Sequence, residues 1–121
     1  MIFHATPIAG LFRIEASRAR DERGAFLRSW CQESFAAARI DFSPIQTSLS
    51  ENTHQHTLRG MHFQIAPAEE QKLIRCVRGA VFDVLVDLRP DQPSYLQHVA
   101  ITLDSSAANA VFAVSYTHLR A

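Results

Sequence analysis

A histidine and two cations lie near one another in the middle of this chain, in a pattern that suits proton transfer. His62 stands among apolar residues of a predicted strand, Arg59 precedes it, and Lys72 opens the next predicted strand. Histidine exchanges a proton near neutral pH, while lysine and arginine stay positively charged there. The set therefore predicts a base that removes a proton and cations that hold an anionic substrate, or an anion formed from it.

Short runs of β-forming residues, separated by turn formers, must position these groups. The predicted strands are residues 2–5, 11–15, 25–30, 45–50, 58–64, 73–78, 80–88, 96–103 and 110–114. One short helix is predicted near 32–39, where alanine is frequent and an acid stands in the first turn. Many short strands in a helix-poor chain predict an all-β fold, a sandwich or a jelly roll.

Local patterns add expectations about turns and buried strands. Residues 89–93 predict a turn and residues 77–80 a tight hairpin. The run 80–88 is apolar on both faces apart from Asp83 and Asp87, which predicts a central strand.

Strand alternation gives the fourth predicted strand two different faces. The side chains of Gln46, Ser48 and Ser50 share one face, and those of Ile45 and Leu49 share the other. We expect the apolar face to be buried, which leaves the polar face to line a cavity or to meet solvent.

The same rule separates Arg59 from His62, because alternation points the two side chains to opposite faces. Gly60 lies between them, and glycine is frequent at bulges that re-aim a strand. We therefore expect irregular strand pairing around Gly60 if both side chains act in one site.

Size, charge and cysteine content exclude several classes of protein. The chain has 121 residues, a length that suits one domain. Its 12 acidic and 12 basic side chains cancel, so it has no net positive charge to attract nucleic acid or an acidic membrane. It has no apolar run of the about 20 residues that span a bilayer, and we expect no secretory leader, because the start lacks the basic and long apolar regions of one. Cys31 and Cys76 lack the spacing of a disulfide framework or a zinc site. We expect a cytoplasmic protein, with Cys76 as a small core residue.

Several motifs, in one order, resemble a known enzyme family. They are 2–11 (Ile-Phe-His-Ala-Thr-Pro-Ile-Ala-Gly-Leu), 21–26 (Asp-Glu-Arg-Gly-Ala-Phe), 46–50 (Gln-Thr-Ser-Leu-Ser), 59–64 (Arg-Gly-Met-His-Phe-Gln), 71–76 (Gln-Lys-Leu-Ile-Arg-Cys) and 79–89 (Gly-Ala-Val-Phe-Asp-Val-Leu-Val-Asp-Leu-Arg). From Met1 to about Leu103 the chain is similar to the dTDP-4-dehydrorhamnose 3,5-epimerase family of nucleotide-sugar enzymes.

The resemblance implies a cofactor-free, cupin-like jelly roll that forms a homodimer and takes a dTDP-linked nucleotide sugar. The implied reaction is epimerisation of a dTDP-4-dehydro-6-deoxyhexose at C3, C5 or both, by proton abstraction α to the C4 ketone, in dTDP-rhamnose biosynthesis. By resemblance His62 is the catalytic base, and Lys72 stabilises the enolate oxygen. The implied substrate-binding residues are Arg23, Phe26, Gln46, Ser48, Ser50 and Arg59, with the two arginines on the diphosphate.

Two internal positions depart from the family pattern. Arg28 stands where members usually have a glutamate, and Ser48 where they often have an asparagine. Both positions bear on the preference for nucleotide and sugar.

A larger departure follows Ala113, where the family's proline–glycine turn, tyrosine acid and base-orienting aspartate are missing. We expect residues 1–114 to be a partial domain, a jelly roll incomplete at the C-terminus, and residues 115–121 to be an unrelated tail without a catalytic role for Tyr116 or His118. Because inversion needs an acid opposite the base, we expect proton exchange with weak net epimerisation. Unpaired sheet edges predict marginal stability and self-association.

A metal-dependent cupin is one alternative interpretation. His54 and His56 lie at strand spacing, so they suit a metal site if His62 or Glu69 completes it. The polar run 50–56 is also typical of an exposed loop.

Two further alternatives use other features of the chain. A jelly roll that binds a nucleotide sugar without catalysis agrees with the presence of pocket residues and the lack of later catalytic ones. A carboxylate-pair hydrolase agrees less well, because strand geometry puts Asp83 and Asp87 about 13 Å apart, whereas glycosidase carboxylates lie about 5–9.5 Å apart. We expect both aspartates to be hydrogen-bonded structural groups.

Overall fold

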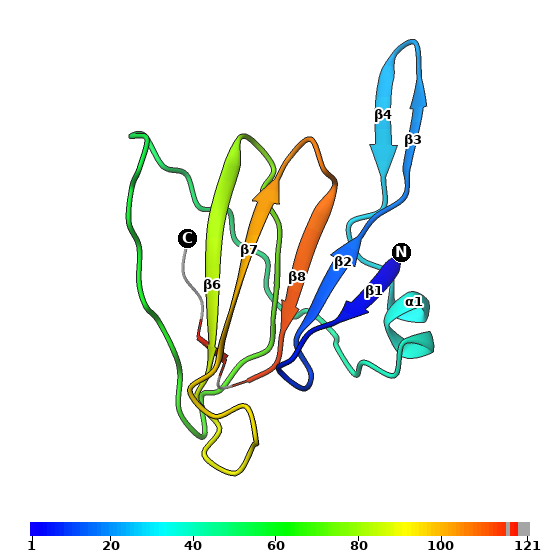
Figure 1. Cartoon of the computed structure of the whole chain (residues 1–121). Coiled ribbons are helices and arrows are strands. Elements are labelled where there is room, and N and C mark those ends of the chain that lie inside the picture. Colours follow the sequence, from blue (N-terminus) through cyan, green and yellow to red (C-terminus); the bar gives the residue numbers. More distant parts are fainter. Residues whose placement is uncertain (116, 119–121) are drawn as a thin grey trace.

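The computed structural model describes residues 1–115, 117 and 118, and its elements are almost all strands (Figure 1). In chain order they are β1 (Ile2–Ala5), β2 (Phe12–Glu15), β3 (Arg18–Asp21), β4 (Gly24–Leu27), α1 (Gln32–Ala37), β5 (Lys72–Ile74), β6 (Ala80–Asp87), β7 (His98–Asp104), β8 (Asn109–Ala113) and β9 (Thr117–His118). The expected all-β fold with one short helix is confirmed. No helix among the described residues is long and apolar enough to cross a membrane.

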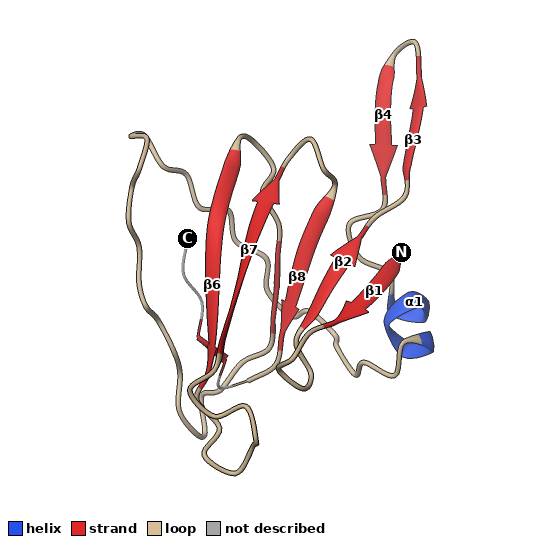
Figure 2. Cartoon of the chain, in the orientation of Figure 1, coloured by secondary structure: helices blue, strands red, loops and turns tan. Residues whose placement is uncertain are grey.

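Two antiparallel sheets and a separate hairpin make up the fold (Figure 2). One sheet has the strand order β1-β2-β8-β5, the other has the order β7-β6-β9, and β3 pairs with β4. Side chains from both sheets, among them Leu85, Leu103 and Val111, form one buried apolar cluster. The two sheets therefore share a core, as in a β-sandwich.

Strand β8 is buried on both of its faces. Val111 and Ala113 belong to the cluster between the sheets, while Ala110 and Phe112 belong to a second cluster that includes Phe35 of α1. Successive strand side chains point to opposite faces, so a strand between two cores must be apolar at nearly every position. The sequence of β8 meets this requirement.

Aromatic rings hold the short helix against the first sheet. The ring of Phe35 lies 5.0 Å from that of Phe3, 5.5 Å from that of Phe42 and 5.8 Å from that of Phe112, measured between centroids. Two of these contacts are edge-on, a favourable aromatic arrangement. A helix of six residues is not stable by itself, so we attribute its stability to this burial.

A buried ion pair fixes the loop that follows β6. The Asp87 carboxylate accepts hydrogen bonds from Arg89 Nε (2.8 Å) and Nη2 (2.7 Å) and from Ser94 Oγ (2.6 Å). Arg89 Nη2 also donates to the carbonyl oxygen of Ala9 (2.8 Å), which ties this loop to the β1–β2 turn. Burial acts to raise the pKa of Asp87, but the hydrogen bonds from Arg89 and Ser94 outweigh it and lower the pKa to about 2. The expected structural role of Asp87 is confirmed.

Some strand expectations were wrong. Residues 45–50 and 58–64 form no regular strand with any described residue. The hairpin expected at 77–80 does not form, because β5 pairs with β8 whereas β6 pairs with β7. Strand β3, which the sequence did not reveal, consists mostly of charged residues and is defined by its pairing with β4 rather than by burial.

Other expectations about elements were confirmed. Strand β6 is the central strand of its sheet, and the turn at 89–93 is closed by a hydrogen bond from the Gln92 amide to the Arg89 carbonyl (3.1 Å). The expected tail at 115–121 falls largely on residues 116 and 119–121, which lie outside the described residues.

Replacing Asp87 with asparagine should remove part of the acid sensitivity of the fold. Because its pKa falls from 3.8 to about 2 on folding, Asp87 stabilises the native state above the higher value, and this contribution is lost as the pH falls toward the lower one. We expect Asp87→Asn to lower the free energy of unfolding by about 3 kcal/mol at neutral pH and to flatten its pH dependence in that acidic window.

Urea unfolding at neutral pH and at about pH 3 measures both effects. The exposed Asp41→Asn variant is the control and should behave as the wild type. An Asp87→Asn variant that loses stability in acid as steeply as the wild type would contradict this role.

Candidate active site

The predicted base lies in an exposed segment rather than in a sheet. Residues 38–71 join α1 to β5 and run out into a wide loop on the β6 side of the molecule (Figure 1). Within this segment His62 forms an isolated β-bridge, and Gly60 has a left-handed backbone with φ of 92°. The chain is thus irregular around Gly60, as expected, but the strand in which irregular pairing was expected does not form.

The apolar face of residues 45–50 is not buried by the described part of the chain. The exposed fraction is 101% for Ile45 and 69% for Leu49, because no described strand packs against them. Two of the three polar residues lie on the same side, as the alternation rule predicts, because Gln46 Nε2 donates a hydrogen bond to Ser48 Oγ (3.3 Å). Ser50 is exposed.

Arg59 is held by the loop that precedes it. Its Nε donates to Asn52 Oδ1 (2.6 Å), and its Nη2 donates to the carbonyl oxygen of Glu51 (3.1 Å). The guanidinium thus closes the stretch from 51 to 59 through two hydrogen bonds, and both acceptors are neutral oxygens. An anion offers a stronger acceptor, since hydrogen bonds between charged partners are about twice as strong as neutral ones.

Lys72 stands at the start of β5 and makes an ion pair with Glu70, whose Oε1 lies 2.8 Å from Lys72 Nζ. Gln64 approaches the same carboxylate oxygen. In the amide orientation that satisfies both of its ends, Gln64 Nε2 donates to Glu70 Oε1 (2.9 Å) and to the Ala68 carbonyl (3.1 Å). The lysine is therefore connected to the segment that carries His62.

Arg23 and Phe26 lie on the β3–β4 hairpin. Arg23 donates from Nε (3.1 Å) and Nη2 (2.6 Å) to Asp21, and this contact lowers the pKa of the Asp21 carboxyl. Phe26 is 77% exposed. Residues 19–21 and 23–26 line an open hollow of about 340 Å³ on the hairpin.

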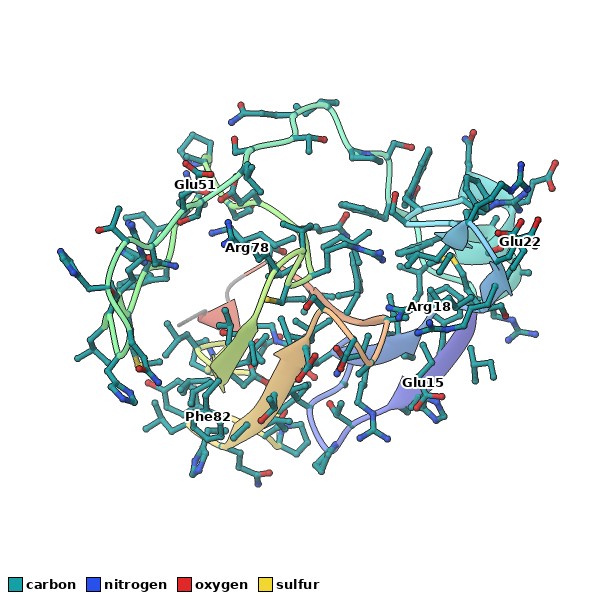
Figure 3. All side chains as sticks on the ribbon, turned by 90° about the horizontal axis from the view of Figure 1, so that it is seen from above. Glu15, Arg18, Glu22, Glu51, Arg78 and Phe82 are labelled. Carbon is teal, nitrogen blue, oxygen red and sulfur yellow. The ribbon has the colours of Figure 1, made fainter. Side chains whose placement is uncertain are left out.

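One copy of the chain does not bring the hairpin to the His62 segment. Figure 3 looks down on the molecule and shows Glu22 of the hairpin and Glu51 of the long segment toward opposite ends of the molecule. Figure 1 shows the same separation from the side. The predicted residues thus form two groups, with Arg23 and Phe26 in one and the residues between 46 and 72 in the other.

The geometry gives no support to the metal-dependent alternative. No three His, Cys, Asp or Glu side chains of the described residues gather in a way that suits a metal ion. His54 and His56 lie in an exposed loop, as the run 50–56 predicted. Cys76 packs partly buried against the cluster between the sheets, as expected of a core residue.

Solved structures share the architecture of this chain over about two thirds of their own length. The dTDP-4-dehydrorhamnose 3,5-epimerase of Bacillus anthracis, solved with TDP and PPi, gives a TM-score of 0.92 at 27% identity, over 98% of this chain and 68% of that one. A dTDP-6-deoxy-D-glucose-3,5-epimerase of Legionella pneumophila, solved with dTDP-4-keto-L-rhamnose, gives a TM-score of 0.90 at 28% identity, over 98% of this chain and 63% of that one. The fold is therefore that of the cupin-like jelly-roll epimerases.

Sequence comparison narrows this class. A family model described as dTDP-4-dehydrorhamnose 3,5-epimerase matches residues 5–117, and the chain belongs to this family. The curated dTDP-4-dehydrorhamnose 3,5-epimerase of Shigella flexneri is 37% identical over 103 residues, which are 83% of this chain and 55% of that protein. The chain thus spans about half the length of such a relative.

Sequence reasoning missed three residues that hold the predicted groups. Asn52 accepts the hydrogen bond of Arg59, and Glu70 and Gln64 connect Lys72 to the His62 segment. Gln64 is part of the motif that drew attention to His62, and Glu70 precedes Lys72 by two positions. Their contacts depend on the path of an irregular loop, which no sequence periodicity describes.

Removing the Arg59 side chain should loosen the stretch from 51 to 59. We expect Arg59→Ala to speed amide hydrogen exchange in this stretch several-fold, because two hydrogen bonds that close it are lost. Exchange followed by mass spectrometry on peptides of residues 50–60 measures this. Arg78→Ala removes another exposed arginine and serves as the control. Identical exchange in the two variants would show that Arg59 does not order the loop.

Proposed function

We propose that this chain carries the proton-abstracting part of an epimerase that acts on a dTDP-4-dehydro-6-deoxyhexose at C3, C5 or both, a step of dTDP-rhamnose biosynthesis. The observation that carries the proposal is the family match over residues 5–117, which includes His62 and Lys72. The relatives' names and the ligands of the two solved structures support the same substrate class.

The chemistry of the substrate gives each group a role. A proton α to the C4 ketone is acidic because the electron pair left on carbon delocalises into the carbonyl oxygen as an enolate. His62 takes this proton onto a ring nitrogen, and Lys72 stabilises the negative enolate oxygen. Proton transfer alone completes this step, so the proposal requires no cofactor.

Inversion of a carbon also needs a proton donor on the opposite face of the sugar ring. We assign none of the described residues to that role. The activity proposed for this chain is therefore isotope exchange at the α carbon, with net epimerisation much weaker. Residues 1–114 are proposed as the partial epimerase domain, and the tail at 115–121 is given no part in the reaction.

The substrate-binding proposal uses the two groups of residues in the structure. Gln46, Ser48 and Ser50 are proposed to line the sugar and nucleotide pocket beside His62, and Arg59 to bind the diphosphate. Arg23 and Phe26 are also proposed to contact substrate, although their hairpin lies across the molecule from the long segment that carries His62 (Figure 1).

This separation supports a homodimer. Phe26 is largely exposed on the projecting hairpin. If this hairpin contacts the His62 segment of a second copy, Arg23 and Phe26 reach a site with His62 although one copy keeps them apart. In a two-fold dimer each copy then gives its hairpin to the other. A cytoplasmic location is proposed from the nucleotide-sugar substrate and from two free cysteines, Cys31 and Cys76.

Proton NMR of dTDP-4-keto-6-deoxyglucose in D2O tests the reaction. We expect the C3 or C5 proton signal to disappear with the wild-type chain, and the rate to fall by about 10²–10⁴-fold in His62→Ala, the range typical of a lost general base. His98→Ala, an exposed histidine on β7, is the control and should exchange as the wild type.

Two other outcomes of this assay would favour a different function or a different base. Binding of dTDP by folded protein with no exchange in any variant would favour the non-catalytic sugar-binding jelly roll. Exchange that persists in His62→Ala would refute the base assignment.

Mixing two inactive variants tests the homodimer. We expect Arg23→Ala and His62→Ala to be inactive separately, while a mixed dimer contains one site with both residues intact. Equal mixing should then recover about a quarter of the wild-type exchange rate. Mixtures no more active than the separate variants, in protein that sediments as a dimer, would show that Arg23 does not serve the partner's site.

A further inference from the structure

Lys72 is the single lysine of the chain, and the other 11 of its 12 lysine and arginine residues are arginines. It lies at the end of a short loop that begins at Gln64, two residues after His62. The loop turns through a hydrogen bond from the Ala68 amide to the Ile65 carbonyl (2.8 Å). Its two ends meet at one atom, Glu70 Oε1, which lies 2.8 Å from Lys72 Nζ and accepts from Gln64 Nε2 at 2.9 Å.

We propose that Glu70 is a positioning residue, which holds the Lys72 ammonium at a fixed place relative to the segment that carries His62. This proposal rests on the proposed function for its catalytic meaning, but the contact itself can be tested without catalysis. Glu70 is not a catalytic residue in this scheme, because it acts on the substrate through Lys72.

The physical need for such a residue follows from the lysine side chain. Its ammonium is a compact charge on a flexible four-carbon stem, so the backbone of β5 alone does not determine where the charge lies. An ammonium has three donors. One hydrogen bond to Glu70 orients the group and leaves two donors for an enolate oxygen.

The loop geometry explains why Glu70 can connect two strands of chain. Side chains of Gln64 and Glu70 are both on the exposed side of the loop, and the Gln64 amide also donates to the Ala68 carbonyl at 3.1 Å. The carboxylate therefore closes the loop at its base while it binds the lysine. A movement of either end changes the distance between Lys72 and the His62 segment.

A different role for the same contact is charge neutralisation, in which Glu70 weakens the effect of Lys72 on an anion. The two roles make opposite predictions for Glu70→Gln. Glutamine keeps an oxygen that can accept from both Lys72 and Gln64, but it removes the negative charge. The Glu70→Gln variant therefore largely keeps Lys72 in position, but it no longer neutralises the charge of Lys72.

Nitrogen-15 labelling of lysine gives a direct readout, because the labelled chain has one side-chain ammonium signal. We compare wild type, Glu70→Gln, Glu70→Ala and the matched control Glu69→Ala, which alters the neighbouring glutamate of the same loop. We expect the ammonium protons to exchange with water about tenfold faster in Glu70→Ala, with a smaller change in Glu70→Gln and none in Glu69→Ala. An unchanged lysine signal in Glu70→Ala would overturn the proposal.

The D2O exchange assay adds the catalytic readout. We expect Glu70→Ala to lower kcat about tenfold with little change in KM, because misplacement of a catalytic group by about 1 Å costs up to 10²-fold in rate. Glu70→Gln should keep most of the wild-type kcat. A higher kcat in both variants would show that Glu70 neutralises the charge of Lys72 and does not position it.

The two proposals fail separately. If the wild-type chain exchanges no substrate protons, the proposed function fails while the lysine signal still reports on Glu70. If exchange of substrate protons depends on His62 but the Lys72 ammonium signal is the same in the Glu70 variants, only the positioning role of Glu70 is wrong. Glu70 is half-exposed, so its variants are expected to fold, and the fold of each is checked by the same NMR sample.

Discussion

Burial of β8 on both faces is the constraint on which the rest of the structure depends. This strand of five residues contributes to the core between the sheets and to the core under α1, and it pairs with β2 on one side and β5 on the other. Its register also reaches the candidate site, because Lys72 is the strand partner of Ala113. The packing of apolar side chains in β8 thus determines where the backbone of the proposed enolate-stabilising residue lies.

The three predicted cations have one property in common: each already binds an oxygen of the protein. Arg23 binds Asp21, Arg59 binds Asn52 and Lys72 binds Glu70. An anionic substrate must compete with these partners. For Arg23 the competition costs little, because its side chain is 85% exposed and surface ion pairs contribute only about 0–1 kcal/mol. The internal partner therefore keeps Arg23 ordered while leaving it available.

The sequence predicts those parts of the fold that depend on burial. Runs 80–88 and 110–114 are apolar because their strands lie in cores, and β6 and β8 form there. The helix near 32–39 is predicted from its alanines and its first-turn acid instead, and the structure adds that Phe35 is buried there. Strand β3 escapes prediction because its charged residues depend on pairing with β4, which periodicity does not reveal.

The site is predicted less completely than the fold. Motif resemblance points to His62, Lys72 and Arg59, but the segment that carries two of them follows an irregular path, so strand alternation fails for Ile45 and Leu49. The partners Asn52 and Glu70 belong to the same irregular path. The family pattern places the hairpin residues with His62, yet only the structure shows that one copy of the chain keeps the hairpin apart from the long segment that carries His62.

The single lysine has a practical meaning for anyone who handles this protein. Amine-reactive dyes, aldehyde cross-linkers and sensor chips that couple through amines all need a primary amine, and this chain offers only the Lys72 side chain and the amino terminus. Coupling at the lysine adds an adduct at the candidate site itself. Attachment through an added terminal tag keeps the site intact, whereas amine coupling blocks it in every molecule that reacts at Lys72.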